Sequence, residues 1–358
     1  MEITCHDLPV PRGMVGGLAA DPARGCLWVG LAGDGRMLWR YDVQTGRFHQ
    51  EPLGDLSSGY SYIHRSIVVD GERLFVGLTW ILGVKPDGVR PNPLTPTLFA
   101  KLLGFLRWTG FLIARSRVLE REDDGRWKVV RNGPFMSIDL ASHQERLYRL
   151  SPKGVVEVSY SGEGVIVPSR GGFVHALEIG PAGEVLVSDS TGEVSLQTDK
   201  VRHILGNLKD IGTGLTHDPK RATPGIDGIT CVGDRYLIGA SRNKARSFIV
   251  DIEQMSWRLL SGLAHAPRAS AVVAASATSA FIASGVGRVG LYRIHADRGD
   301  ATAIESLGEI ESDGTRCHHL HDLVVWPDGR IFGGEFFPLD VPEPPWPDRP
   351  CKLWEIRP

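Results

Sequence analysis

Short apolar runs separated by turn residues dominate the pattern of hydrophobic and polar positions along this chain. The runs are rich in Val, Ile and Leu, and they end at turn sequences such as Asp70-Gly71 and Asp328-Gly329. Runs of about four to eight residues closed by such turns are typical of β-strands, and the apolar positions lack the 3.6-residue period of helices. The pattern therefore predicts an all-β protein.

The apolar runs recur as a repeat. Each copy has an apolar strand, a turn, a second strand ending in small residues, and a third strand with an aromatic residue. A period of about 40 to 50 residues is typical of propellers, so we expect one seven-bladed β-propeller domain over residues 1–358. The first strands of the seven copies begin at Gly16, His64, Phe135, His175, Asp227, Ser270 and His321.

The chain ends suggest how such a ring closes. The segment from Glu2 to Val10 precedes the first repeat, and Lys352 to Ile356 supplies only a third strand to the last. If the N-terminal segment is the outer strand of the last blade, no open sheet edge remains. This closure also brings Cys5 and Cys351 close together.

Two insertions, at about 81–116 and 336–350, interrupt the repeat between second and third strands, and we expect both to overhang one mouth of the channel. The apolar stretch in 97–114 contains Lys101 and Arg107, which argues against a membrane span. Packing on the rim or a homo-oligomer contact are the alternatives for it.

Composition narrows the expected partners. Lys and Arg total 40 and Asp and Glu total 42, so the net charge of -2 gives no reason to expect nucleic acid or an anionic membrane. The N-terminus has no signal-peptide pattern, which predicts a cytoplasmic location unless a leader has been removed. Five cysteines without a CxxC pair argue against a disulfide scaffold and a thiolate zinc site.

Polar residues gather where strand starts, strand-two ends and insertions should meet at one mouth. Three histidines and an aspartate fall among the strand starts, and convergent titratable groups are typical of a binding or active site. A channel histidine bonded to water is the alternative for each one alone. The expected substrate-binding residues are Tyr60, Trp80, Asp227, Arg242, Glu335 and Arg316.

Two short motifs stand out within this set. In Cys317-His318-His319-Leu320-His321, strand alternation would point His319 and His321 the same way, and a third imidazole from His64 or His175 would suit a divalent transition metal. The candidate cofactors are the divalent metals Mn, Zn and Ca. In the second motif, Tyr60, Tyr62 and His64 would alternate onto one face beside Arg65. Aromatic packing between blades is the alternative for Tyr60.

The tyrosine-rich segment with His64-Arg65, and His321-Asp322 followed by Pro327-Asp328-Gly329-Arg330 and Gly334-Glu335, resemble seven-bladed propeller enzymes that degrade uronate-containing glycans. These are the rhamnosyl-glucuronate lyases and related rhamnosidases. The histidine cluster is more loosely similar to that of oligogalacturonate lyases, without their full ligand pattern.

This resemblance implies a lyase that cleaves a uronate-containing oligosaccharide by β-elimination. Such a reaction needs a group that neutralises the carboxylate, a base and an acid. Arg65, Arg242 or a metal would hold the carboxylate, His64 would be the base, and Tyr62 or His175 the acid. A hydrolase would instead use a carboxylate pair, for which the candidates are Asp227, Asp189 and Glu335.

Two other functions stay open. The propeller fold hosts many unrelated functions, so a non-catalytic propeller that binds a protein or a small ligand is the main alternative. A metal-dependent lactonase-type hydrolase is the other, and it would require Asp, Glu and Asn at the channel.

Overall fold

We describe the protein from a computed structural model. The structure describes residues 1–10, 14–32, 36–60, 62–81, 114–134, 137–151, 154–161, 163–168, 174–180, 182–189, 193–197, 202–207, 226–241, 246–260, 263–264, 269–336 and 349–358.

Antiparallel groups of four strands build the fold, and we name each group by its first strand in the lists that follow. The β2 group has β2 (Met14–Asp21), β3 (Cys26–Ala32), β4 (Leu38–Asp42) and β5 (Arg47–Gln50). The β6 group has β6 (Tyr62–Asp70), β7 (Arg73–Ile81), β8 (Ala114–Arg121) and β9 (Trp127–Pro134). The β10 group has β10 (Asp139–His143), β11 (Arg146–Ser151), β12 (Gly154–Val158) and β13 (Glu163–Pro168). Single pairings, Ala32 with Tyr62 and Arg65 with Asp139, join these three groups into one 12-stranded sheet.

The remaining groups are separate four-stranded sheets. The β14 group has β14 (Val174–Ile179), β15 (Val185–Asp189), β16 (Glu193–Gln197) and β17 (Arg202–Asn207). The β18 group has β18 (Ile226–Val232), β19 (Tyr236–Ser241), β20 (Arg246–Asp251) and β21 (Ser256–Leu260). The β22 group has β22 (Ala269–Ser276), β23 (Ser279–Ser284), β24 (Gly290–His295) and β25 (Ile304–Glu309). The β28 group has β28 (Leu320–Val325), β29 (Ile331–Glu335), β30 (Lys352–Arg357) and β1 (Glu2–Asp7).

Little else is regular within the described residues. A two-stranded ribbon of β26 (Glu311–Ser312) and β27 (Thr315–Arg316) precedes β28. The helical segments described are short 3-10 turns at Pro22–Arg24, Gly54–Ser57 and Asp300–Thr302. None of the helices described is long and apolar enough to cross a membrane. The prediction of an all-β fold is confirmed.

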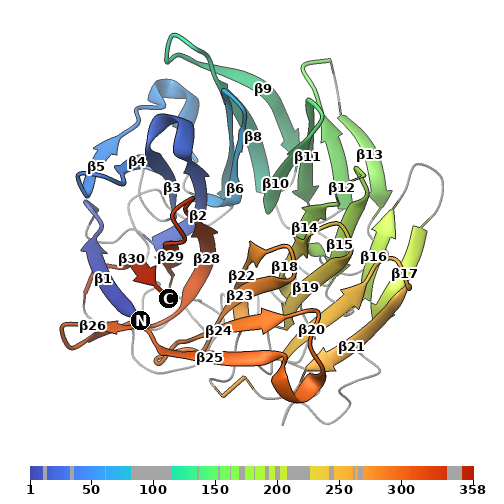
Figure 1. The fold of residues 1–358 in the computed structure, drawn as a ribbon. Coiled ribbons are helices and arrows are strands. Elements are labelled where there is room, and N and C mark those ends of the chain that lie inside the picture. The colour runs from blue at the N-terminus through green and yellow to red at the C-terminus, as the bar shows by residue number, and fades with distance from the viewer. Residues whose placement is uncertain are drawn as a thin grey trace, which may run out of the picture.

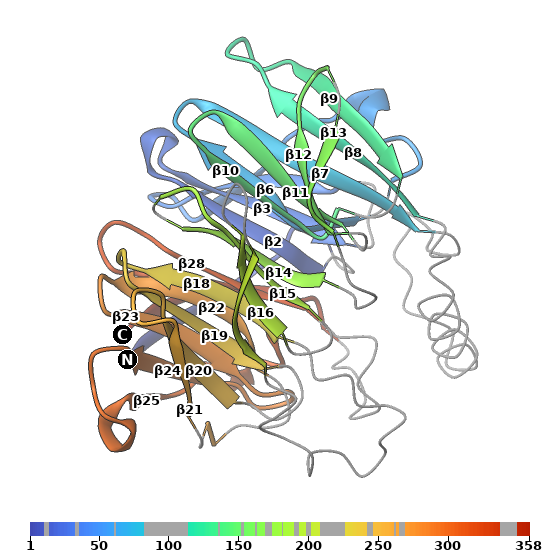
Figure 2. The same ribbon diagram turned by 90° about the vertical axis from the view of Figure 1, so that its right-hand side faces the viewer.

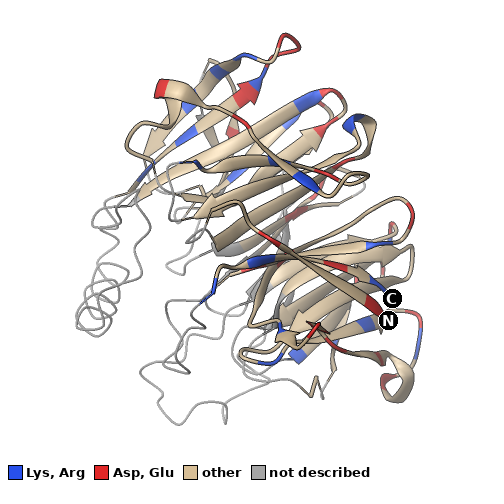
Figure 3. Ribbon diagram, turned by 90° about the vertical axis from the view of Figure 1, so that its left-hand side faces the viewer, with Lys and Arg blue, Asp and Glu red and all other residues tan. Residues whose placement is uncertain are grey.

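The strand groups follow one another in chain order around a common centre, with the first strand of each group nearest to it (Figure 1). Seen after a 90° turn, the strands of neighbouring groups run side by side with a common slant (Figure 2). Basic and acidic residues are interspersed along the described strands and turns (Figure 3). From this side, the described ribbon therefore shows no long run of one charge (Figure 3).

Turn chemistry and close packing explain the strand boundaries. Gly71 adopts a φ of +60° between β6 and β7, a left-handed conformation that glycine tolerates best. A different constraint acts at Gly17 in β2, where a Cβ atom would lie 2.3 Å from the carbonyl oxygen of His64 and 3.0 Å from the Cα of Arg65. Only glycine therefore lets the backbones of β2 and β6 approach this closely.

The hydrophobic core is divided into clusters that lie between consecutive groups. One cluster joins the β2 and β6 groups through side chains such as Trp28, Ile63 and Leu119. Another joins the last group to the first and includes Val15, Leu27, Phe332 and Leu353, each fully buried. Burial of apolar surface between sheets is thus the main force that holds neighbouring groups together.

The N-terminal strand completes the last group. β1 pairs with β30 in antiparallel register from Glu2 opposite Arg357 to Asp7 opposite Lys352. The predicted pairing of these segments is therefore confirmed, and Cys5 lies opposite Trp354, three residues from Cys351 in the sequence. The two insertions, including the apolar stretch, fall largely outside the described residues, so their expected position over the mouth stays a prediction.

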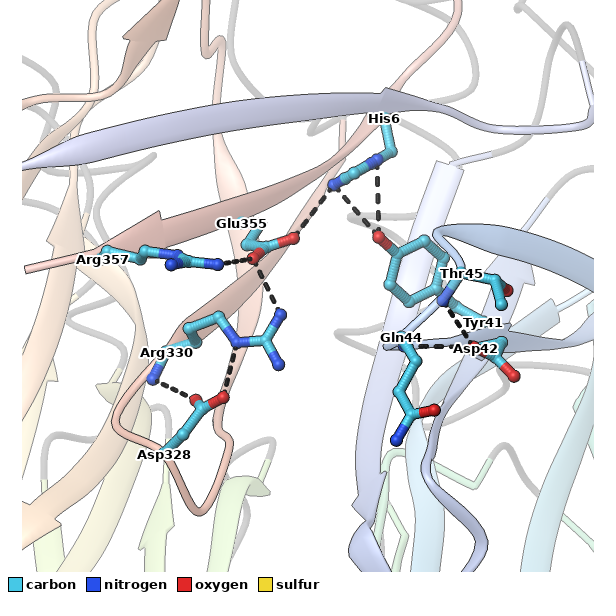
Figure 4. A network of polar contacts seen from close by, with 9 residues as sticks. All are labelled: His6, Tyr41, Asp42, Gln44, Thr45, Asp328, Arg330, Glu355 and Arg357. Carbon is cyan, nitrogen blue, oxygen red and sulfur yellow. Dashed lines mark hydrogen bonds and ion pairs between the residues drawn. The ribbon is translucent and has the colours of Figure 1, made fainter.

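A polar network ties β1 to the β2 group as well (Figure 4). The imidazole of His6 lies 3.3 Å from Oε2 of Glu355 on β30 and 3.1 Å, through Nε2, from the hydroxyl of Tyr41 on β4. Arg330 Nη1 donates to Glu355 Oε1 at 2.9 Å, and its Nε donates to Asp328 at 2.8 Å. Side chains from both ends of the chain and from the first group therefore meet in one set of contacts.

Candidate functional site

The sequence predicts that the first residues of the first strands lie at one level along the channel axis. In the structure, those of them that are described lie where the pairing between first and second strands is irregular. The ladder between the first and second strands shifts register after Val15, Ile63, Val174, Ile226, Ala269 and Leu320. A bulge leaves a residue unpaired and redirects its side chain, and bulges are common near functional sites. The predicted ring members that lie at these shifts are Gly16, His64, His175, Asp227, Ser270 and His321, whereas Phe135 lies outside the described residues.

Four aromatic rings meet where β6 and β28 begin, and we call Tyr62, His64, His321 and Phe336 the mouth cluster. His64 and His321 stand edge to face with ring centroids 4.5 Å apart. Tyr62 lies 5.4 Å from His64, and Phe336 lies 4.7 Å from His321. His64 Nδ1 donates to the carbonyl of Ile138 at 2.6 Å, which leaves Nε2 as the acceptor of a neutral ring. The predicted proximity of Tyr62, His64 and His321 is present in the structure.

Arg65 follows His64 on β6 and contacts the backbone of this cluster. Its Nε and Nη2 donate to the carbonyl oxygen of His321 at 3.2 and 2.7 Å. The guanidinium therefore fixes the backbone of β28 at the bulge that presents His321. Since Arg65 and His64 are consecutive on β6, one strand positions both the imidazole and the cation.

A cavity of about 340 Å³ lies against Arg65. Its walls come from the first strands of several groups, and we call it the channel cavity. Three carboxyl groups line it, Asp139 on β10, Glu178 on β14 and Asp322 on β28, together with His143. Among the described residues that line the cavity, Arg65 is the only Lys or Arg. The lining thus contains three acids and one permanent cation.

Burial dominates the titration of these carboxyl groups. Desolvation raises the pKa of Glu178 to about 8 and that of Asp322 to about 6, although Arg65 partly opposes the shift at Asp322. Desolvation also raises the pKa of Asp139 well above its usual value, with Arg65 again opposing and Asp322 and Glu178 adding to the shift. The single guanidinium of Arg65 therefore does not offset the desolvation of the three half-buried carboxyl groups.

Backbone amides hold two of these acids in place. Asp322 accepts from the Leu18 amide of the neighbouring group at 2.8 Å and from the Leu323 amide at 3.0 Å. Asp139 accepts from the amide of Leu140 at 2.9 Å. Neither Asp139 nor Glu178 is among the candidate residues expected from the sequence. An acidic residue inside an otherwise apolar first strand is the signal that would have found both.

Glu335, expected to bind substrate, has a fully buried side chain with four donors around it. Arg349 donates to it through Nη1 at 2.6 Å and Nη2 at 2.7 Å. The amides of His318 and Lys352 donate at 2.8 and 3.0 Å. These contacts tie together the chain segments around β29, and such a carboxylate is positioned to support structure rather than to bind a ligand.

Tyr60 does not share the face of Tyr62 and His64 as expected. Its ring is 3% exposed, and its centroid lies 5.6 Å from Cζ of Arg115 and 5.1 Å from Cζ of Arg117. Trp80, at the end of β7, lies 5.0 Å from Arg115. Arg316 is exposed and pairs with Glu311 in the β26–β27 ribbon. These three residues therefore lie in different surroundings from the mouth cluster.

Other predicted residues are placed only by their backbone or lie outside the described part. His175 and Asp227 lie at the bulges of β14 and β18, and Asp189 ends β15. Their side chains and the whole of Arg242 fall outside the described residues.

The strand alternation expected to align His319 with His321 does not apply. β28 begins at Leu320, and its ladder shifts register between Leu320 and Asp322. The His319 ring bonds through Nδ1 to the carbonyl of Gly285 at 3.1 Å, whereas His321 packs against His64 and Phe336. Within the described part of the chain, no three His, Cys, Asp or Glu residues are grouped as metal ligands. The predicted metal site therefore has no support from these residues.

Comparisons with known proteins show the fold. No protein-family profile and no curated protein sequence matches the chain. Among solved structures, YCF48 bound to D1 peptide is similar with a TM-score of 0.61 and 12% identity, over 99% of this chain and 94% of that one. The WD40 β-propeller domain of Doa1 has a TM-score of 0.60 and 10% identity, over 98% and 95%. U3-55K has a TM-score of 0.61 and 12% identity, over 99% and 98%. The chain therefore has an all-β, propeller-like fold.

Proposed function

We propose that this protein is a non-catalytic propeller that binds a ligand through its central channel, and that the ligand places a cationic group in the channel cavity. The observation that carries the proposal is the excess of acid over base among the described residues that line that cavity. Asp139, Glu178 and Asp322 line the cavity together with a single guanidinium, that of Arg65. A ligand amine or guanidinium would supply the missing charge and form charge-assisted hydrogen bonds.

The architecture that we propose for this function is one seven-bladed domain. Each four-stranded group would be a blade, and β1 would close the ring by pairing with β30. The apolar cluster between the last and first groups and the contacts of His6 with Tyr41 support this closure. A closed ring fixes the first strands around the axis, so the carboxyl groups are held before the ligand arrives.

The size of the cavity and one structural neighbour favour a side chain or small amine as the ligand group. The volume of about 340 Å³ is near the lower end of ligand pockets. The YCF48 structure was solved with a bound peptide. A lysine or arginine of a partner peptide is therefore our preferred ligand group, and a free amine would use the same chemistry.

A thermal-shift screen tests the proposal. The panel contains amines, guanidines and short lysine peptides, each with an uncharged isostere such as the norleucine peptide. We expect cationic members to raise the melting temperature of the wild type and their isosteres to leave it unchanged. Glu178→Gln should weaken the response, because its described side-chain contacts involve only the neighbouring Ile179 amide. A response that does not depend on ligand charge would contradict the proposal.

The mouth cluster supports a second candidate function, acid–base chemistry such as β-elimination of a uronate glycan. The specific observation is the His64 ring, whose Nδ1 donates to the carbonyl of Ile138 and whose Nε2 would act as the base when the ring is neutral. Tyr62 would be the acid beside it, 5.4 Å between ring centroids. Release of an unsaturated product absorbing at about 232 nm, lost in His64→Ala, would favour this function over simple binding.

A further inference from the structure

A second set of residues, away from the channel cavity, combines exposed positive charge with aromatic support. We call Tyr60, Trp80, Arg115 and Arg117 the arginine shelf. The Arg115 guanidinium lies 5.6 Å from the Tyr60 ring and 5.0 Å from the Trp80 ring, and Arg117 lies 5.1 Å from Tyr60. Arg115 is exposed, whereas Tyr60 is buried beneath it. The rings therefore hold a surface guanidinium in a fixed place.

The charge balance of the shelf differs from that around most arginines described. On the same sheet, Arg73 pairs with Glu120 at 2.8 Å and Arg121 pairs with Glu51 at 3.1 Å. Within the described residues, neither Arg115 nor Arg117 has a carboxylate at ion-pair distance. Arg117 instead donates to Asn132 Oδ1 at 2.8 Å and to the carbonyl of Leu56 at 2.7 Å.

Within the described residues, the contacts of the Arg115 side chain are with the Tyr60 and Trp80 rings and not with a hydrogen-bond acceptor. The N–H donors of arginine lie in the plane of the group and match the two oxygens of a carboxylate. Arg115 therefore offers an oriented set of donors, and Arg117 keeps part of its donor set beside it. Surface ion pairs are usually weak because both side chains lose conformational freedom when the pair forms. The ring contacts already restrict the Arg115 side chain, so less freedom is lost when a partner binds.

We propose that the arginine shelf docks an extended acidic segment of a partner protein, with carboxylates at alternate positions. Arg115 and Arg117 are two residues apart on β8, so their side chains leave the same face about 7 Å apart. Alternate side chains of an extended peptide have the same spacing. This docking surface is separate from the channel ligand and does not depend on it.

Fluorescence polarisation with a labelled peptide of sequence Gly-Asp-Ser-Asp-Ser-Asp-Gly tests this inference at low ionic strength. The same peptide with asparagine in place of aspartate is the matched probe. We expect saturable binding of the acidic peptide alone and at least a tenfold loss of affinity in Arg115→Gln. Arg115→Lys should recover only part of it, because an ammonium lacks the planar edge.

Arg126→Gln is the control, because Arg126 is an exposed arginine of the β8–β9 turn and its loss removes the same charge. Circular dichroism would establish that all variants are folded. Equal binding of the two peptides, equal losses in Arg115→Gln and Arg126→Gln, or no saturable binding would each overturn the inference. Stronger binding of a phosphoserine peptide would also overturn it in favour of a phosphate site. The amine screen on Arg115→Gln should match the wild type, so failure here is distinct from failure of the channel proposal.

Discussion

Arg65 and His321 belong to strands from distant parts of the chain, yet two guanidinium nitrogens of Arg65 donate to the backbone carbonyl of His321 at 2.7 and 3.2 Å. The contact connects the mouth cluster to the channel cavity, because Arg65 also lines that cavity and His321 faces His64. One side chain thus shapes the mouth and counters the channel acids.

Replacing Arg65 should therefore destabilise the fold. Arg65→Gln removes the donors to His321 and the only Lys or Arg among the described cavity-lining residues. Hydrogen bonds of charged groups contribute about 1.5 to 3 kcal/mol, so we expect a loss of about that size in the free energy of unfolding. Urea unfolding at pH 7 measures it, with Arg126→Gln as a surface control expected to change by about 0.5 kcal/mol at most. Equal effects of the two substitutions would show that the His321 contact matters little.

The channel acids predict an unusual dependence of stability on pH. Burial raises the pKa of Glu178 to about 8, above that of an unfolded glutamate, so the folded state holds a proton that the unfolded state releases. The contribution of Glu178 to the free energy of unfolding is fully present below the pKa that this glutamate has in the unfolded chain, and it decreases as the pH rises toward 8. Glu178→Gln should be more stable than wild type at pH 8, by on the order of 1 kcal/mol or more, and nearly equal at pH 4. A pH-independent difference between the two proteins would contradict the assignment.

Glu335 gives a direct contrast between a structural role and a ligand-binding role. Its carboxylate is fully buried and paired with Arg349, and removing one partner of a buried pair costs about 3 to 5 kcal/mol. We expect Glu335→Ala to lose stability in this range, and Glu335→Ala/Arg349→Met to recover part of it. Differential scanning calorimetry of the variants measures this. A stable Glu335→Ala protein with impaired ligand binding would instead support the role first expected from the sequence.

Removal of β1 tests the proposed closure of the ring. Without residues 1–7, the edge of β30 loses its partner strand, and the contacts of His6 with Glu355 and Tyr41 are lost. Exposed strand edges pair with other chains, so we expect a lower melting temperature and concentration-dependent association. Light scattering with size-exclusion chromatography measures the association. A truncated protein that remains monomeric and equally stable would argue against a closing role for β1.

Much of the fold could be predicted from local sequence patterns, because strands and turns depend on the residues within and next to them. The Asp70-Gly71 and Asp328-Gly329 turns and the pairing of β1 with β30 could all be predicted. The repeat also placed His64 and His321 at equivalent strand starts, and their rings do meet. These predictions succeed because they depend on turn chemistry, on the period of the repeat and on the missing outer strand of its last copy.

The roles of individual polar residues depended on partners far away in the sequence. Glu335 and Tyr60 have side chains of the kind that bind ligands. In the structure, however, Arg349 donates hydrogen bonds to the Glu335 carboxylate, and the guanidinium groups of Arg115 and Arg117 contact the Tyr60 ring. The alternation expected at His319 failed because the strand begins later and contains a bulge. Side-chain direction at a bulge does not follow from strand periodicity, so the sequence alone could not resolve it.

Isothermal titration calorimetry of a cationic ligand in buffers of different ionisation enthalpy is the sharpest test of cation binding in the channel cavity. At pH 7 we expect the best lysine peptide from the screen to release protons on binding. The bound ammonium should lower the raised pKa of Glu178, so that this group ionises. Glu178→Gln should release fewer protons and bind more weakly, whereas Arg115→Gln should behave as wild type. Binding without proton release, unchanged in Glu178→Gln, would contradict a cationic ligand group in the channel cavity.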